Sequence, residues 1–84
     1  MTITLPTVHL NGTSREMLLD GYTEAYRKLI EFREAFARIE CNARDYYVQG
    51  PDAYPRARNL RDAQFQHIVD LMRYLESHLL HLGA

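Results

Sequence analysis

The feature that most constrains the fold is a run of apolar residues spaced by alternating intervals of four and three. The run comprises Leu18, Tyr22, Ala25, Leu29, Phe32, Phe36 and Ile39. Three unbroken heptads of this kind predict a long helix that packs nearly straight along another helix, in the manner of a coiled coil. The other side carries charged residues, with Glu24–Lys28 and Glu34–Arg38 spaced as i,i+4 pairs, and this pattern predicts a solvated face.

The ends of the helices can be placed from capping and breaking residues. Thr13 and Glu16 fit a capping box, in which each side chain accepts a hydrogen bond from a free backbone N–H group. Gly50-Pro51 is the firmest break in the chain. We therefore expect a first helix at about 14–41, a turn at 42–53 and a second helix at about 54–82.

The second helix is apolar over more of its circumference than one partner helix covers. We expect Asp52 or Tyr54 to cap it, Pro55 to lie in its first turn and Gly83 to end it. Its apolar residues are Leu60, Phe65, Ile68, Val69, Leu71, Met72, Leu75, Leu79, Leu80 and Leu82. A two-helix hairpin would leave part of this surface in water. We therefore predict an all-α antiparallel hairpin that assembles into a homo-oligomer, by default a four-helix bundle of two hairpins, with higher cyclic forms as the alternative.

Residues 1–12 precede the first helix as an extended N-terminal arm. The arm is rich in β-branched residues and contains Pro6, and Ile3, Leu5, Val8 and Leu10 give it apolar side chains to bury. A lone strand has no sheet partner within a helical hairpin. The arm is therefore expected either on its own helices or on a neighbouring subunit, and residues 13–84 are expected to form a single α-hairpin domain.

Composition argues against several classes of function. The 84 residues are 46% apolar and carry a formal net charge of −1, which describes a folded chain without a global attraction for nucleic acid or anionic lipid. Neither expected helix has the basic face that duplex DNA requires, so nucleic-acid binding is not expected. No stretch approaches the ~20 apolar residues of a membrane span. Because Cys41 is the single cysteine and the N-terminus lacks a secretory leader, we expect a cytoplasmic protein without an internal disulfide.

The turn between the helices is longer and more aromatic than a helix connection requires, since bundles use ~2–8 residues. The turn and the start of the second helix hold the candidate ligand-binding residues Arg44, Tyr46, Tyr47, Gln49, Tyr54, Arg56 and Arg58. Arginine forks bind phosphate, tyrosine rings stack on flat rings, and a glutamine amide bonds to a ring edge. These types predict a site for a nucleotide-like anion. The alternatives are that Tyr46 and Tyr47 plug the hairpin end or seal a subunit interface, and that Arg56, Arg58 and Arg61 form a solvated first turn that pairs with Asp52 or Asp62.

Other candidate chemistry is less specific. His67, His78 and His81 fall on one side of the second helix, where we interpret them as a polar stripe at the rim of a bundle rather than as zinc ligands. No metal and no cofactor are predicted. The chain has no phosphate-binding loop and no nucleophile elbow, and Cys41 falls at a helix C-terminus, where the helix dipole disfavours a thiolate. We do not expect an enzyme.

Two stretches, HLNGTS at residues 9–14 and RDYYVQGP at residues 44–51, carry a resemblance to a known group of proteins. They resemble small helical-hairpin accessory proteins of tailed bacteriophages and prophages, and the likeness covers most of the chain. The resemblance implies an accessory phage product that acts in the host cytoplasm. Small phage proteins of similar design assemble as helical homo-oligomers and hold nucleotide signals of host defence, which is an analogy of architecture.

These observations predict a binding protein that sequesters, without turnover, a small anionic nucleotide-like ligand at a subunit interface. Arg44, Tyr46, Tyr47 and Gln49 are the leading contacts. The alternative is a protein–protein adaptor or inhibitor that docks a host protein through the apolar face of the second helix. A structural role in a virion is the third class.

Overall fold

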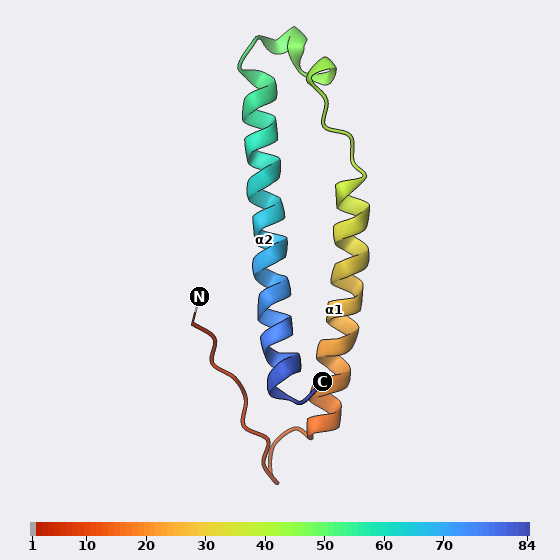
Figure 1. Cartoon of the computed structure of the whole chain (residues 1–84), viewed down its shortest axis with the longest axis vertical. Helices are drawn as coiled ribbons and strands as arrows, with labels where there is room; N and C mark the ends of the chain where they lie inside the picture. The colour runs from red at the N-terminus through yellow and green to blue at the C-terminus, as the bar shows by residue number, and fades with distance from the viewer. Residues whose placement is uncertain (1) are drawn as a thin grey trace.

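The computed structural model of the chain describes residues 2–84 and is built from helices (Figure 1). The elements are α1 (Arg15–Ala37), the short 3-10 turns η1 (Ala43–Asp45) and η2 (Tyr47–Gln49), and α2 (Ala53–His81). Within residues 2–84 there is no β-strand. α1 and α2 lie side by side and run in opposite directions, so the predicted all-α hairpin is confirmed.

The hairpin is a thin rod of 61 × 24 × 17 Å with a radius of gyration of 18.3 Å. A compact domain of this length would have a radius of gyration of about 12 Å. The rod exposes 6425 Å² of surface to solvent, whereas a compact monomer of 9.9 kDa exposes about 5,200 Å². The single chain therefore leaves more surface in water than a folded monomer of its mass usually does.

The core is the narrow seam where α1 meets α2. Leu29, Ile68 and Leu75 are buried there, and the residues packed around them are Tyr22, Tyr26, Phe36, Phe65 and Met72. The predicted apolar run of α1 is only partly used, because Phe32 keeps 53% of its surface exposed and Ala25 is also exposed. Tyr26, outside that run, packs on the core instead. One neighbouring helix covers one stripe of α1, so the outer part of the run stays in water.

The charged side of α1 is solvated as predicted, but its ion pairs differ from the predicted ones. Glu24 pairs with Arg27 at 3.5 Å and Lys28 pairs with Glu31 at 3.7 Å, both at i,i+3 spacing. All four side chains are exposed, so these pairs contribute little to stability.

α1 ends at Ala37, earlier than the predicted residue 41. The chain then crosses toward α2 before η1 begins, with Asn42 in an extended conformation. α1 has no basic residue in its last turn to complement its free carbonyl groups. Arg61 of α2 supplies that positive charge, because its guanidinium bonds to the carbonyl oxygens of Phe36 and Ala37.

α2 begins and ends close to the predicted positions. Asp52 occupies the N-cap position, although its side chain makes no capping hydrogen bond, and Pro55 lies in the first turn as expected. At the other end Gly83 has a φ of +90°, the left-handed conformation that closes a helix. Neither helix of residues 2–84 combines the length and hydropathy that a membrane crossing needs.

The arm packs on its own α2 (Figure 1). Ile3 lines a hollow of about 440 Å³ together with Arg73, Ser77 and Leu80 of α2. The carbonyl oxygen of Pro6 lies 2.6 Å from Nε2 of His81, which donates the hydrogen bond. Of the two positions expected for the arm, the structure shows the one on the same chain.

The N-cap of α1 is Ser14 and not the predicted Thr13. The Oγ of Ser14 accepts a hydrogen bond from the backbone N–H of Met17 at 3.1 Å. The helix thus starts one residue later than the capping box requires, and Glu16 falls within the first turn, where its charge complements the helix dipole.

We predict that Ser14→Ala lowers the free energy of unfolding by about 1 kcal/mol, because the N–H of Met17 loses its acceptor. Thr13→Ala is the matched control and should change it by less than about 0.5 kcal/mol. Urea denaturation followed by circular dichroism measures both. A larger loss for Thr13→Ala than for Ser14→Ala would contradict the observed cap.

Candidate functional site

The candidate site lies at the turn end of the hairpin, where three predicted binding residues come together. The Tyr46 ring lies 6.3 Å from the Tyr54 ring, centroid to centroid, at an interplanar angle of 42°. The guanidinium carbon of Arg58 lies 5.7 Å from the centroid of the Tyr54 ring, within cation–π range. Tyr54 and Arg58 are one turn apart on α2, and Tyr46 reaches them from between η1 and η2. A row of two aromatic rings and one cation results.

The path of the turn follows from local backbone geometry. Each 3-10 turn spans three residues, and the second one ends at Gly50, whose φ is +116°. That conformation strains any residue with a Cβ atom, which explains glycine at this position. The backbone N–H of Ala53 then donates to the carbonyl oxygen of Gly50 at 3.4 Å, and α2 begins.

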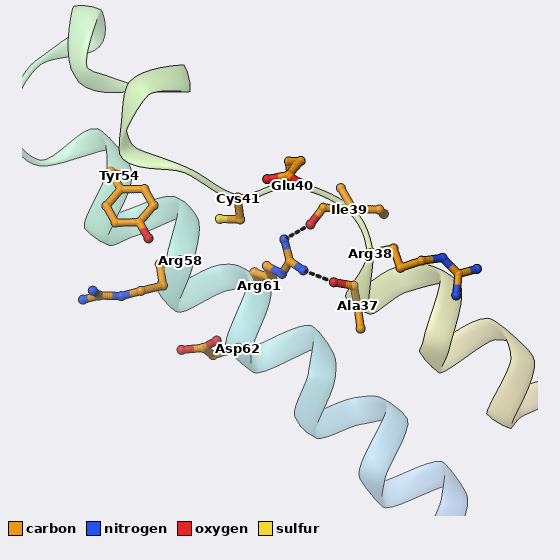
Figure 2. A pocket seen from close by; sticks show the side chains of 9 residues that line it. All are labelled: Ala37, Arg38, Ile39, Glu40, Cys41, Tyr54, Arg58, Arg61 and Asp62. Atoms are coloured by element: carbon orange, nitrogen blue, oxygen red, sulfur yellow. Dashed lines mark hydrogen bonds between the residues drawn. The ribbon is translucent and has the colours of Figure 1, made fainter.

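Arg61 ties the end of α1 to α2 (Figure 2). Its guanidinium donates hydrogen bonds to the carbonyl oxygens of Ile39 and Ala37, the latter at 3.2 Å, and to that of Phe36 at 3.5 Å. The same group lies 5.8 Å from the Phe36 ring and 5.6 Å from the Phe65 ring. Arg61 therefore satisfies carbonyls that α1 leaves free and lies between two core aromatics.

An open hollow of about 670 Å³ lies between α2 and the segment that follows α1. It is lined by Ala37, Arg38, Ile39, Glu40, Cys41, Tyr54, Arg58, Arg61 and Asp62. Figure 2 shows Arg61 at one side of it, Tyr54 and Arg58 along α2, and Arg38 pointing away from them. Between residues 38 and 62 the chain carries five arginines and four carboxylates, so the local surplus of positive charge is small.

Among the described residues no side-chain hydrogen bond, ring pair or cation–π contact joins the other predicted site residues to this row. Arg44, Gln49 and Arg56 are exposed, and Tyr47 keeps 70% of its surface exposed. Within the single chain Tyr47 therefore does not plug the hairpin end, whereas the half-buried Tyr46 partly does.

Sequence reasoning missed the residues that form the opposite wall of the hollow. Glu40 and Cys41 reach it because α1 stops early and the chain crosses over. Arg61 was expected in the solvated first turns of helix 2, yet it bonds carbonyls more than twenty positions earlier in the chain. No local pattern marks such a contact. The lack of a basic residue in the last turn of α1 appears only once the structure shows that the helix ends at Ala37, since the predicted end at residue 41 would have included Arg38.

The predicted histidine stripe is wrong for His78, which is the most buried side chain of the described residues at 2% exposure. Its ring stacks on Tyr22 at 4.4 Å and lies 4.4 Å from Tyr74, and Nδ1 donates to the carbonyl oxygen of Tyr74 at 2.8 Å. The ring is apolar enough to fill the seam once one nitrogen is bonded. Across residues 2–84 no group of three histidine, cysteine or acidic side chains is arranged to hold a metal ion.

Two tyrosines of the seam have perturbed acidity. Tyr26 donates a hydrogen bond from its hydroxyl to Oε1 of Glu76 at 2.6 Å, and this bond, with some burial, raises the pKa of Tyr26 above 10.0. Burial, followed by the neighbouring Tyr74, raises the pKa of Tyr22. In both cases the structure favours the neutral phenol.

Comparison of the chain with models of known protein families, with curated proteins and with solved structures found no match.

We predict that Arg61→Ala frays the end of α1 and lowers the free energy of unfolding by about 1.5–3 kcal/mol, the range for hydrogen bonds to a charged group. Arg61→Lys should recover only part of the loss, because an ammonium cannot reproduce the planar fork. Arg58→Ala is the control on the same helix and should cost less than about 1 kcal/mol. Equal losses for Arg58→Ala and Arg61→Ala in urea denaturation would refute the clamp.

We predict that stability falls as pH rises above about 10. The neutral phenols are favoured in the folded state, so their contribution is complete below the unfolded pKa and is lost as pH rises through the raised folded pKa values of Tyr26 and Tyr22. Tyr26→Phe and Glu76→Gln should each reduce this loss of stability at alkaline pH. Each removes one of the two groups, the ionised Tyr26 phenolate or the Glu76 carboxylate, whose negative charges would otherwise be in contact. Urea denaturation at a series of pH values tests this, and an unchanged slope in both variants would contradict it.

Proposed function

We propose that the protein binds, without turnover, a small anionic ligand that carries a flat ring, as a nucleotide does, at the turn end of the hairpin. The observation that carries the proposal is the state of the arginines there. The ion pairs within residues 2–84 are Glu24–Arg27 and Lys28–Glu31, both on α1. Arg38, Arg44, Arg56 and Arg58 therefore have no carboxylate within ion-pair distance, although four carboxylates occur in the same stretch of chain.

The row formed by Tyr46, Tyr54 and Arg58 supports the choice of ligand class. Tyrosine faces stack on bases with little dependence on sequence, and a guanidinium fork binds phosphate oxygens in pairs. The adjoining hollow of about 670 Å³ falls within the range of small-molecule sites. The guanidinium of Arg61 is already hydrogen-bonded to backbone carbonyl oxygens. Arg58 is therefore the arginine of the hollow best placed to bind a phosphate.

The proposal includes self-association. The chain exposes about 1,200 Å² more than a compact monomer of its mass, and a standard protein interface removes about 800 Å² per partner. One such interface would bring the exposed surface into the usual range. A homo-oligomer of the bundle type is the assembly that this excess supports.

The phage context and the host cytoplasm remain part of the proposal through the resemblance of HLNGTS and RDYYVQGP to phage accessory proteins. A nucleotide signal of host defence is the ligand type that this context favours. Cys41, which is not in a disulfide, is compatible with a reducing compartment.

A second candidate function is that of an adaptor or inhibitor that docks a host protein. The observation that favours it is the exposure of Leu71 and Tyr74 on α2, at 47% and 37%. This face is apolar, and the row at the turn end would then have no ligand to bind. A chain that stays monomeric and captures a defined partner through Leu71 would favour this candidate.

We predict that ADP-ribose or a cyclic dinucleotide raises the melting temperature of the full chain. At 100 times its Kd such a ligand would stabilise the fold by about 2.7 kcal/mol, which corresponds to roughly 10–20 °C. Tyr54→Ala and Arg58→Ala should abolish the shift, because they remove the stacking face and the phosphate fork.

Arg27→Ala is the matched control, since Arg27 is exposed on α1 and lies ten residues before the hollow begins. It should leave the shift unchanged. Inorganic phosphate and adenosine, tested separately, report the phosphate and the ring contribution. If neither compound class shifts the melting temperature, or if Arg27→Ala removes the shift as fully as Arg58→Ala does, binding at this site is refuted.

A further inference from the structure

One face of the hairpin is apolar and open along its length. On α1 it contains Met17, Gly21, Ala25, Lys28 and Phe32, and on α2 it contains Leu60, Gln64, His67, Leu71 and Tyr74. Neighbours in each set are three or four positions apart, so each set follows one side of its helix. Two hollows of about 320 and 270 Å³ lie between these sides, lined mainly by apolar groups. We refer to this surface as the open face.

The open face holds most of the large apolar side chains that the helices expose. Of six such residues in α1 and α2, five lie on it, namely Met17, Phe32, Leu60, Leu71 and Tyr74. The sixth, Leu80, lies on the side of α2 that meets the arm. Lys28, which lies at the border with the charged side of α1 and pairs with Glu31, is the one charged residue of the open face. A surface of this composition resembles the core of an interface more than a solvated surface.

We infer that a second copy of the chain covers the open face, related by a two-fold axis that runs along the rods, so that both turns lie at the same end. The inference rests on the proposed self-association and specifies its surface and orientation. The chain exposes about 1,200 Å² more than a compact monomer of its mass, and each partner in a standard dimer buries about 800 Å². No larger partner is needed to account for it.

The contacts within the chain determine which residues would meet. Tyr22 lies level with His78, Arg33 with Met72, and Phe36 with Phe65. With a two-fold axis along the rods, α1 of one copy faces α2 of the other at the same level.

At those levels large side chains meet small or apolar ones. Phe32 would pack on Leu71 of the second copy, and Tyr74 of the second copy would enter the hollow beside Gly21 and Ala25. Lys28 would approach the ring of that Tyr74, where a cation is favoured. Symmetry makes each contact twice.

The opposite orientation, with turns at opposite ends, is less favourable. In that orientation the two-fold axis would run perpendicular to the rods, along the direction from α1 to α2. α1 would then face α1 of the second copy. The open face runs from the level of Met17 to that of Leu60, which lies about five residues beyond the Phe36–Phe65 contact, so the middle of the whole face falls close to Lys28 on α1. The two Lys28–Glu31 ion pairs would then lie near the axis within an apolar surface, where their charged groups lose hydration.

The experiment measures mass by analytical ultracentrifugation and distance by pulsed electron resonance, with spin labels on the single native cysteine, Cys41. We expect a dimer with labels less than about 25 Å apart, the width of a bundle whose helices are 8–10 Å apart. Turns at opposite ends would place the labels roughly 40 Å apart, since Cys41 lies beside Arg61 of α2, about 13 residues from Tyr74 near the middle of the open face, at 1.5 Å per residue.

Two variants test the surface. Leu71→Glu should raise the dimer Kd at least about 100-fold, because each dimer loses two buried leucines. Ala25→Trp fills the hollow without removing any core contact, so it should weaken the dimer while circular dichroism shows an intact hairpin. Arg27→Trp places the same ring on the solvated side and is the matched control.

The outcomes separate this inference from the proposed function. A monomer at all concentrations overturns both the self-association and the inference, and it favours the adaptor. A dimer with labels roughly 40 Å apart, or one that Ala25→Trp and Arg27→Trp affect equally, overturns the orientation or the surface while leaving self-association in place. Ligand shifts in melting temperature, with the Tyr54→Ala and Arg58→Ala variants, test the binding site separately.

Discussion

Two helices share one interface, so each helix of this hairpin can bury only one side. That constraint explains why Leu29, Ile68 and Leu75 are the only aliphatic side chains in the buried cluster of the described chain. Three such residues contribute roughly 1.5–3 kcal/mol each, which is little against the entropy of ordering a chain of this length. The arm covers a further side of α2 with Ile3, but the open face has no cover within the chain. Because the core is so small, the hairpin needs more of its apolar area to be buried than the single chain buries.

Polar contacts along the seam hold α1 and α2 in position, which so small an apolar core cannot do by itself. Arg61 holds the end of α1 against α2, and Tyr26 is bonded to Glu76 near the middle of the seam. His78 fills the seam between Tyr22 and Tyr74. Such contacts depend on direction, whereas apolar packing does not, so they determine how the two helices are aligned along the rod. The candidate site inherits this alignment, because Tyr54 and Arg58 are about two turns and one turn before Arg61 on the same helix.

The helices, their order and the turn could be predicted from the sequence because periodicity and breakers act locally. The alternation from Leu18 to Ile39 requires only neighbouring residues, and so does the break at Gly50-Pro51. Of the candidate site, Tyr54 and Arg58 could be identified by residue type and position. The carbonyl contacts of Arg61 and the burial of His78 could not, because each depends on which residue of α1 lies level with which residue of α2. The periodic pattern permits several such alignments.

Joining two copies at the turn end would couple assembly to ligand binding. Each copy brings five arginines and four carboxylates between residues 38 and 62, so the two ends repel each other only weakly before any ligand arrives. An anion bound where the ends meet would neutralise that surplus and would contact arginines of both copies. By linkage, a ligand that binds the dimer more tightly than the monomer also tightens the dimer by the same factor. A near-neutral turn end is therefore better suited to such coupling than a strongly basic one, which would hold the copies apart until ligand was present.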